Sequence, residues 1–175
     1  MKKAKKTALA GILSALTVII LLLGSIFEVL DMSMAAISSF ITVLACIELS
    51  GKYPLLIYAT SSAVSLLLLP NKYGVLLYIL FFGYYPIIKR KLDRGVKSKL
   101  LRRLIKLLIF AFSMAAVELL YFFVFAVKIE EGFTASAVLF TVAVAVIADA
   151  ILDIALDRLT VVYIIKWRKY IEKYL

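Results

Sequence analysis

The sequence predicts an all-α membrane protein, a bundle of six transmembrane helices with both termini in the cytoplasm. Of its 175 residues, 65% are hydrophobic and only 18% are charged, and the mean hydropathy is +1.05. A soluble domain is typically about 45–50% apolar and about 25% charged. A disordered chain needs low hydrophobicity. The composition therefore excludes both classes, and the apolar runs and the placement of basic residues support the membrane prediction.

Six hydrophobic segments are candidate spans of a single membrane domain, because a helix needs about 20 apolar residues to cross a bilayer. They cover residues 7–29, 32–49, 53–69, 73–88, 104–127 and 133–156. The third and fourth are short and are separated only by Pro70-Asn71-Lys72, which is typical of a tight turn. An alternative joins these two into one broken hairpin that re-enters the membrane. The first apolar run is too long for a cleaved signal peptide.

Lysine and arginine positions set the orientation of these spans. With the N-terminus inside, 19 of the 21 basic residues fall on the cytoplasmic side, and Lys72 and Lys128 fall outside. This asymmetry follows the positive-inside rule. We therefore expect a multi-pass protein of the plasma membrane. The net charge of +10 then lies mainly at the cytoplasmic surface, where anionic membrane lipid attracts the basic residues. Nucleic-acid binding is disfavoured, because no stacking platform accompanies the charge.

Two cytoplasmic segments lie outside the spans. In the loop 89–103 and just beyond it, apolar residues recur every four positions, at Leu92, Val96, Leu100 and Leu104. This spacing predicts an amphipathic helix lying in the membrane interface. Residues 159–175 are too charged to span and are expected to form a cytoplasmic tail, with Trp167 as an interfacial anchor.

The sequence carries no recognisable catalytic motif. It has no histidine and one cysteine, Cys46, and no Gly-rich phosphate loop is visible. A Cys/His metal site cannot be built from these residues. We therefore expect a protein that is not an enzyme and that uses no metal and no cofactor.

Acidic residues inside spans are informative, because a charge at bilayer depth costs about 2.5–3.5 kcal/mol. Glu118 lies in the fifth span, and no lysine or arginine lies at a comparable depth. Tyr121 follows three residues later on the same helical face. Two interpretations stay open. Glu118 either contacts a substrate in an outward-facing pocket or is a neutral group hydrogen-bonded between helices.

Further substrate-binding candidates lie toward the outer side. Glu28, Asp31 and Asn71 lie near the outer turns, where they form either the rim of a pocket or a solvated turn. Tyr78 belongs to an aromatic-rich fourth span, whose rings either pack the bundle or stack on a flat ligand.

Three aspartates in the sixth span, Asp149, Asp153 and Asp157, recur every four residues and share one helical stripe. One interpretation is a salt-bridge seam to basic residues of the cytoplasmic loop, namely Arg102, Arg103 or Lys106. The other is a cation or proton path, or a docking surface for a partner.

The first span carries two overlapping patterns of small residues, Gly11/Ala15 and Ala10/Ser14. Small residues allow close helix packing, within the bundle or against a partner.

In architecture, most of the chain resembles the substrate-binding (S) components of the energy-coupling-factor (ECF) vitamin transporters. The local cue is the run from Lys6 to Leu16, KTALAGILSAL, which is similar to the alanine-rich opening of that family's first helix. The resemblance implies capture of a vitamin-like small-molecule substrate from outside, with a transmembrane coupling subunit and ATPases as partners. It also implies a pocket in the outer halves of the later helices, where Glu118, Tyr121 and Tyr78 fall.

Two other functions stay open. One is a structural subunit of an envelope-assembly complex, and the other is a small ion- or proton-coupled carrier that uses Glu118 and the aspartate stripe. An outward cavity near Glu118 would favour the binding subunit. A filled bundle with an exposed apolar groove would favour the scaffold, and acids connected across the full thickness would favour the carrier.

Overall fold

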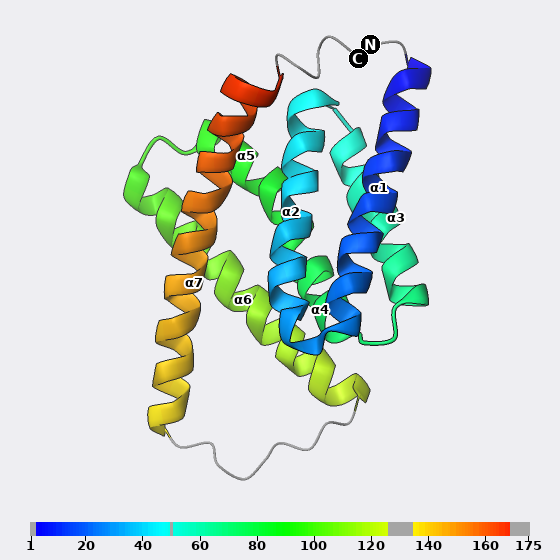
Figure 1. The fold of residues 1–175 in the computed structure, drawn as a ribbon. Coiled ribbons are helices and arrows are strands. Elements are labelled where there is room, and N and C mark those ends of the chain that lie inside the picture. The colour runs from blue at the N-terminus through cyan, green and yellow to red at the C-terminus, as the bar shows by residue number, and fades with distance from the viewer. Residues whose placement is uncertain (1–2, 50, 126–134, 169–175) are drawn as a thin grey trace.

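The computed structural model describes residues 3–49, 51–125 and 135–168, and almost all of these residues are helical (Figure 1). The prediction of an all-α fold is confirmed for this part of the chain, which contains no strand.

The first three helices pack together, and each runs antiparallel to the next in sequence (Figure 1). Helix α1 spans Lys3–Ile26, and the short 3₁₀ turn η1 spans Glu28–Leu30. Helix α2 spans Asp31–Glu48 and α3 spans Tyr53–Leu68, and α1 packs against both of them. At 1.5 Å per residue, α1 is about 36 Å long and α2 about 27 Å. Among the described residues, α1 and α2 are long and apolar enough to cross a membrane.

The expected fourth span is divided into several pieces. Helix α4 spans Tyr73–Leu77, the π-helical segment η2 spans Tyr78–Phe82, and α5 spans Tyr85–Gly95. A Cβ atom at Gly83 would lie 2.6 Å from the Tyr58 ring, so glycine permits the close approach of η2 to α3. A proline in the first turn of α5 then starts a new helix.

The segment 89–103 also differs from the single amphipathic helix that we expected. Helix α5 ends at Gly95, and residues 96–98 are not helical. Helix α6 then spans Lys99–Phe125. Helix α7 spans Ala135–Val162 and continues into the π-helical segment η3, Tyr163–Trp167. The first part of the expected tail is therefore a continuation of α7. Residues 169–175 lie outside the described part.

The helices alternate in direction between the two ends of the bundle. The start of α1, the turn between α2 and α3, and the end of η3 lie at the upper end in Figure 1. Segment η1 and the turn between α3 and α4 lie at the lower end. The upper end therefore carries the first and the last described helical residues together.

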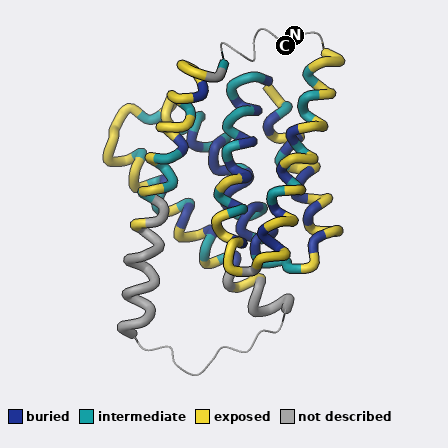
Figure 2. The backbone as a smooth tube through the Cα atoms, in the orientation of Figure 1, coloured by how far each residue is buried: buried dark blue, intermediate teal, exposed yellow. Residues whose placement is uncertain are grey.

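The core lies where α2, η2, α5 and α6 meet. Phe81 is its centre, with ring centroids 4.7 Å from Tyr85, 5.0 Å from Phe110 and 5.1 Å from Phe82. Buried residues lie on the inward faces of the helices, whereas outward faces are exposed (Figure 2). Those outward faces are apolar, with Leu67 82% and Phe112 78% exposed.

Candidate functional site

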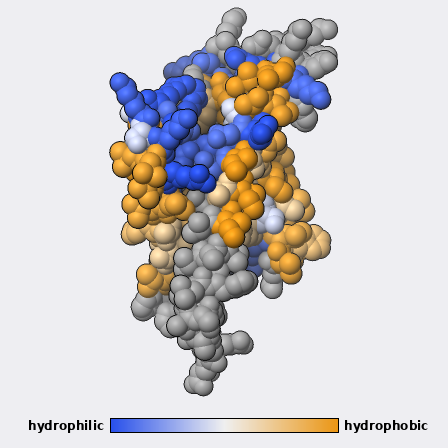
Figure 3. Space-filling view, turned by 90° about the vertical axis from the view of Figure 1, so that its left-hand side faces the viewer, coloured by the Kyte–Doolittle hydropathy of each residue, from blue (hydrophilic) through white to orange (hydrophobic). Residues whose placement is uncertain are grey.

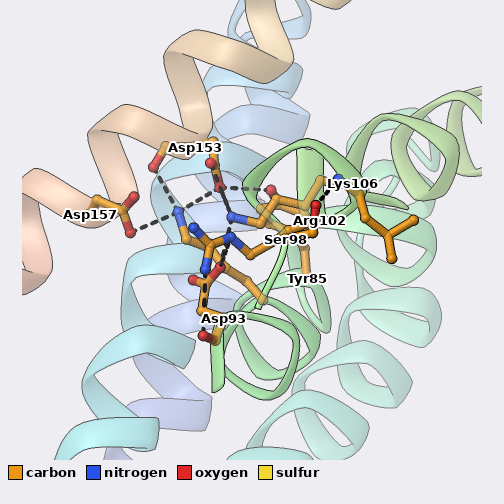
Figure 4. Close-up of polar contacts among 9 residues, drawn as sticks. Tyr85, Asp93, Ser98, Arg102, Lys106, Asp153 and Asp157 are labelled. Atoms are coloured by element: carbon orange, nitrogen blue, oxygen red, sulfur yellow. Dashed lines mark hydrogen bonds and ion pairs between the residues drawn. The ribbon is translucent and has the colours of Figure 1, made fainter. Parts of the chain in front are cut away.

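The most strongly charged part of the interior lies where α5, α6 and α7 meet (Figure 4). Each helix supplies two charged residues four positions apart. These are Lys89 and Asp93, Arg102 and Lys106, and Asp153 and Asp157. Because residues four apart share one face of a helix, the charged faces of α5, α6 and α7 contact one another at this point. We call these six residues the ion network.

Asp153 is the centre of the ion network. Its Oδ1 lies 2.5 Å from Lys89 Nζ, and Lys89 also donates to the Asp153 backbone carbonyl at 2.7 Å. Lys106 Nζ lies 3.1 Å from both carboxylate oxygens, and the Tyr85 hydroxyl donates at 2.9 Å. Lys89 and Lys106 are only 6% and 7% exposed, so Asp153 neutralises two buried cations.

The outer members of the network complete its charge balance. Asp157 lies 2.9 Å from Lys89 Nζ, and Asp93 lies 3.1 Å from Lys106 Nζ and 3.4 Å from Arg102 Nε. Three carboxylates therefore face three cations. No group of three metal-ligating side chains is found in the described residues. The arrangement is a salt-bridge seam, with no uncompensated carboxylate to hold a cation.

The sequence predicted Arg102, Arg103 or Lys106 as partners for the aspartates, whereas Lys89 was not predicted. Lys106 contacts Asp153 directly, whereas Arg102 contacts Asp93. The missed signal was the four-residue spacing of Tyr85, Lys89 and Asp93, which puts all three on one face of α5.

Two cavities flank the ion network. One, of about 390 Å³, lies between α6 and α7 and also reaches Asp93 of α5. The other, of about 420 Å³, lies between α2, α5 and α7. Asp93 and Asp157 line both cavities, so the network forms the wall between them.

A second polar group lies inside the bundle around Tyr78. Tyr78 is completely buried, and its hydroxyl lies 2.9 Å from Ser61 Oγ. Thr42, Ser62 and Ser65 are buried nearby on α2 and α3. These three hydroxyls have no hydrogen-bond partner of normal geometry within the described residues. We call Tyr78, Ser61, Thr42, Ser62 and Ser65 the hydroxyl cluster.

Asp31 and Asn71 meet at the opposite end of the bundle from the ion network. Asn71 Nδ2 donates to Asp31 Oδ2 at 2.8 Å, and the Asn71 backbone N–H donates to Ser25 Oγ at 2.9 Å. Asp31 is 5% exposed, and a Cβ atom at Gly74 would lie 2.7 Å from its Oδ1. The structure thus brings two of the predicted residues together in a polar contact between α2 and the turn before α4, and Asp31 is buried in this contact. The alternative of a solvated turn is therefore wrong for Asp31.

Four predicted site residues, and the predicted anchor Trp167, have side chains outside the described part of the structure. Glu118 and Tyr121 lie in α6, Asp149 lies in α7 and Glu28 lies in η1. Their assigned roles stay predictions.

The small residues of α1 divide between two faces. Gly11 and Ala15 are exposed, and nothing lies within 4 Å of the position of a Gly11 Cβ atom. Ala10 is half-buried, and Ser14 Oγ lies 2.9 Å from Thr60 Oγ1 of α3. The Ala10/Ser14 pattern therefore faces α3 inside the bundle, and the Gly11/Ala15 pattern faces outward.

An apolar groove of about 580 Å³ lies between α1, α2 and α7. Leu13, Phe40 and Leu159 are among its walls. At its end, Glu48 accepts a hydrogen bond from the Tyr163 hydroxyl at 3.2 Å and lies 3.6 Å from Arg168 Nε. This groove is larger than either cavity beside the ion network.

Comparisons with protein-family models, curated proteins and solved structures found no match to this chain. The functional argument therefore depends on the chemistry of these sites.

Proposed function

We propose that this chain is a multi-pass plasma-membrane protein with six spans and both ends in the cytoplasm, and that it is the solute-binding subunit of a transporter. It captures a vitamin-like small molecule from outside. Partner subunits then supply the ATP-driven step, because the sequence has no phosphate-binding loop of its own.

The distribution of polarity supports the membrane placement. Leucine, isoleucine and phenylalanine side chains are exposed along α1, α3, α6 and α7. Soluble monomers rarely expose apolar surface of this extent. Hydrophilic residues gather toward one end of the face seen in Figure 3, with hydrophobic surface below them. A band of apolar surface beside a basic end is what a bilayer with an anionic inner leaflet requires.

The hydroxyl cluster is the observation that carries the solute-binding role. An unsatisfied buried hydroxyl costs about 1–3 kcal/mol, and an apolar membrane offers it no alternative partner. Thr42 and Ser62 nevertheless make no well-formed hydrogen bond, although they face the hydroxyls of Tyr78 and Tyr58, and the buried Ser65 hydroxyl has no partner within the described residues. A small polar solute would satisfy these hydroxyls. The rings of Tyr58 and Tyr78, with centroids 6.1 Å apart, add aromatic surface for a flat ligand.

The outward face of α1 supports a subunit role. Because Gly11 and Ala15 are small and exposed, a neighbouring helix can approach this face closely. The resemblance to the S components implies a coupling subunit at this surface.

A scaffold in an envelope-assembly complex is the second candidate. It is favoured by the filled aromatic core around Phe81 and by the apolar groove between α1, α2 and α7. A carrier is less supported, because Asp153 and Asp157 are already neutralised by lysines.

A thermal-shift screen of the purified full chain in detergent, against vitamins and small amines, tests the solute-binding role. A ligand at 100 times its Kd stabilises by about 2.7 kcal/mol, which corresponds to a rise in Tm of about 5–11 °C for a chain of this size. Thr42→Val removes a buried hydroxyl at nearly constant shape, so it should reduce this shift. Thr7→Val changes an exposed hydroxyl and should leave the shift unchanged. No response to any compound, with a stoichiometric membrane partner recovered, would favour the scaffold.

The topology is tested separately by cysteine labelling in intact cells. Cys46 is buried, which leaves introduced cysteines as the reactive sites. A membrane-impermeant maleimide should label Lys72→Cys, and should label Lys3→Cys and Arg94→Cys only after the cells are opened. Labelling of Arg94→Cys in intact cells would contradict the proposed orientation.

A further inference from the structure

The cleft of about 420 Å³ between α2, α5 and α7 combines charged and apolar walls. Val43 and Ile47 of α2 and Ile164 of η3 form part of its apolar lining. Arg90 and Arg94, four positions apart on α5, form a basic wall. A site with both kinds of wall matches a ligand that carries a charged head and an apolar tail.

The charge of this cleft is not internally balanced. The two acids in its lining, Asp93 and Asp157, are already engaged by the cations of the ion network. Arg90 and Arg94 form no ion pair with a carboxylate among the described residues. Two arginines therefore face the cleft with their positive charge available to an anion.

The identity of the two basic residues narrows the class of anion. A guanidinium group has a planar set of donors that fits phosphate oxygens in a bidentate manner. In the proposed orientation the cleft lies at the cytoplasmic interface, where anionic lipid headgroups are found. The apolar walls would have no function toward free phosphate, but they match acyl chains.

We propose that this cleft binds the phosphate headgroup of an anionic phospholipid of the cytoplasmic leaflet, with Arg90 and Arg94 as its ligands. The inference rests on the membrane placement proposed above, and it is independent of which solute the chain captures. A bound lipid would fill the space between α5 and α7 beside the ion network.

Native mass spectrometry of the full chain, titrated with phosphatidylglycerol or phosphatidylcholine in detergent, tests the proposal. We expect saturable binding of one phosphatidylglycerol at least tenfold tighter than phosphatidylcholine. The double substitution Arg90→Gln/Arg94→Gln should weaken phosphatidylglycerol binding about 30-fold. That factor corresponds to about 2 kcal/mol, at about 1 kcal/mol for each basic residue.

The matched control is Lys91→Gln/Lys97→Gln, which removes the same charge from exposed positions that do not line the cleft. Its phosphatidylglycerol affinity should stay within twofold of the parent. An equal loss in both double variants would overturn the proposal, since binding would then reflect net charge alone. So would equal affinity for the two lipids. Displacement of the lipid by millimolar inorganic phosphate would overturn the lipid assignment in favour of a soluble phosphate.

These outcomes are separate from those of the solute screen. Loss of lipid selectivity with a persistent solute-induced thermal shift would refute only the lipid site. Labelling of Arg94→Cys from outside would remove the shared membrane orientation and refute both.

Discussion

Removing the carboxylate of Asp153 is the strongest test of the ion network. Lys89 and Lys106 are 6% and 7% exposed, and both lie within ion-pair distance of this side chain. Loss of one partner from a buried ion pair costs about 3–5 kcal/mol, because the remaining charge is left uncompensated. The Asp153 side chain is 27% exposed, so water screens part of the effect. We therefore expect Asp153→Ala to destabilise the fold by about 2–3 kcal/mol.

Asp157→Ala is the matched control, one turn away on the same helix. Its side chain is 64% exposed, and its partner Lys89 keeps Asp153, so the expected cost is below about 1 kcal/mol. The assay is the Tm of the purified full chain in detergent, read as the fraction that stays monodisperse after heating. One kcal/mol corresponds to about 2–4 °C for a chain of this size. Asp153→Ala should thus lower the Tm by about 4–12 °C and Asp157→Ala by less than about 4 °C.

Equal shifts for the two variants would refute the reasoning. A double-mutant cycle gives an independent check. If Lys106 and Asp153 stabilise one another, then Lys106→Met combined with Asp153→Ala should destabilise by about 0.5–3 kcal/mol less than the sum of the single changes. Strict additivity would mean that the 3.1 Å contact between them contributes nothing.

Three further predictions use the same melting assay. Gly74→Ala puts a Cβ atom 2.7 Å from Asp31 Oδ1 and should destabilise by about 1–3 kcal/mol, and an unchanged Tm would contradict this contact. Gly11→Ala, in open space within α1, should raise the Tm, with a gain of about 0.5–1 kcal/mol, and a loss of stability would show a neighbour at that position. Tyr78→Phe removes the hydroxyl that lies 2.9 Å from Ser61 and should cost about 0.5–1.5 kcal/mol, whereas a Tm at or above that of the parent would argue against this hydrogen bond.

Local sequence signals were sufficient for the helical class, and the bounds of α2 and α3 lie within one residue of two predicted segments. Apolar runs bounded by turn residues predicted a segment at 53–69, and α3 spans Tyr53–Leu68. The same kind of signal failed at 89–103. Apolar residues keep a four-residue spacing across this segment, but α5 ends at Gly95 and the chain turns before Lys99. The turn brings Asp93 back toward Lys106, a contact between two helices that periodicity does not encode.

The interior polar groups were harder to predict than the helices. Lys89 was assigned to a cytoplasmic loop because it is charged, yet it is buried against Asp153, which is 64 residues away in sequence. Only the tertiary arrangement, which brings the Lys89 side chain of α5 to Asp153 of α7, reveals this pair. The hydroxyl cluster was missed for a similar reason. Ser61 and Ser65 share a face of α3, but serine spacing alone does not show which face is buried.

Polar contacts help to set the position of α7, together with the apolar packing of Leu152 and Leu156 against the core around Phe81. Its isoleucines Ile147, Ile151 and Ile154 are all more than half exposed. In the membrane placement proposed above, burial of such side chains against another helix gains little, because lipid is equally apolar. Directional contacts then select the docked position, and α7 makes them through Asp153 and Asp157. Hollows lie on both flanks of α7, while Leu156 and the hydrogen bond from the Tyr163 hydroxyl to Glu48 still hold this segment once the Asp153 carboxylate is lost. The structural response to Asp153→Ala should therefore be a local loosening of α7 around Lys89 and Lys106, with the contacts of Phe81 to Tyr85 and Phe110 intact.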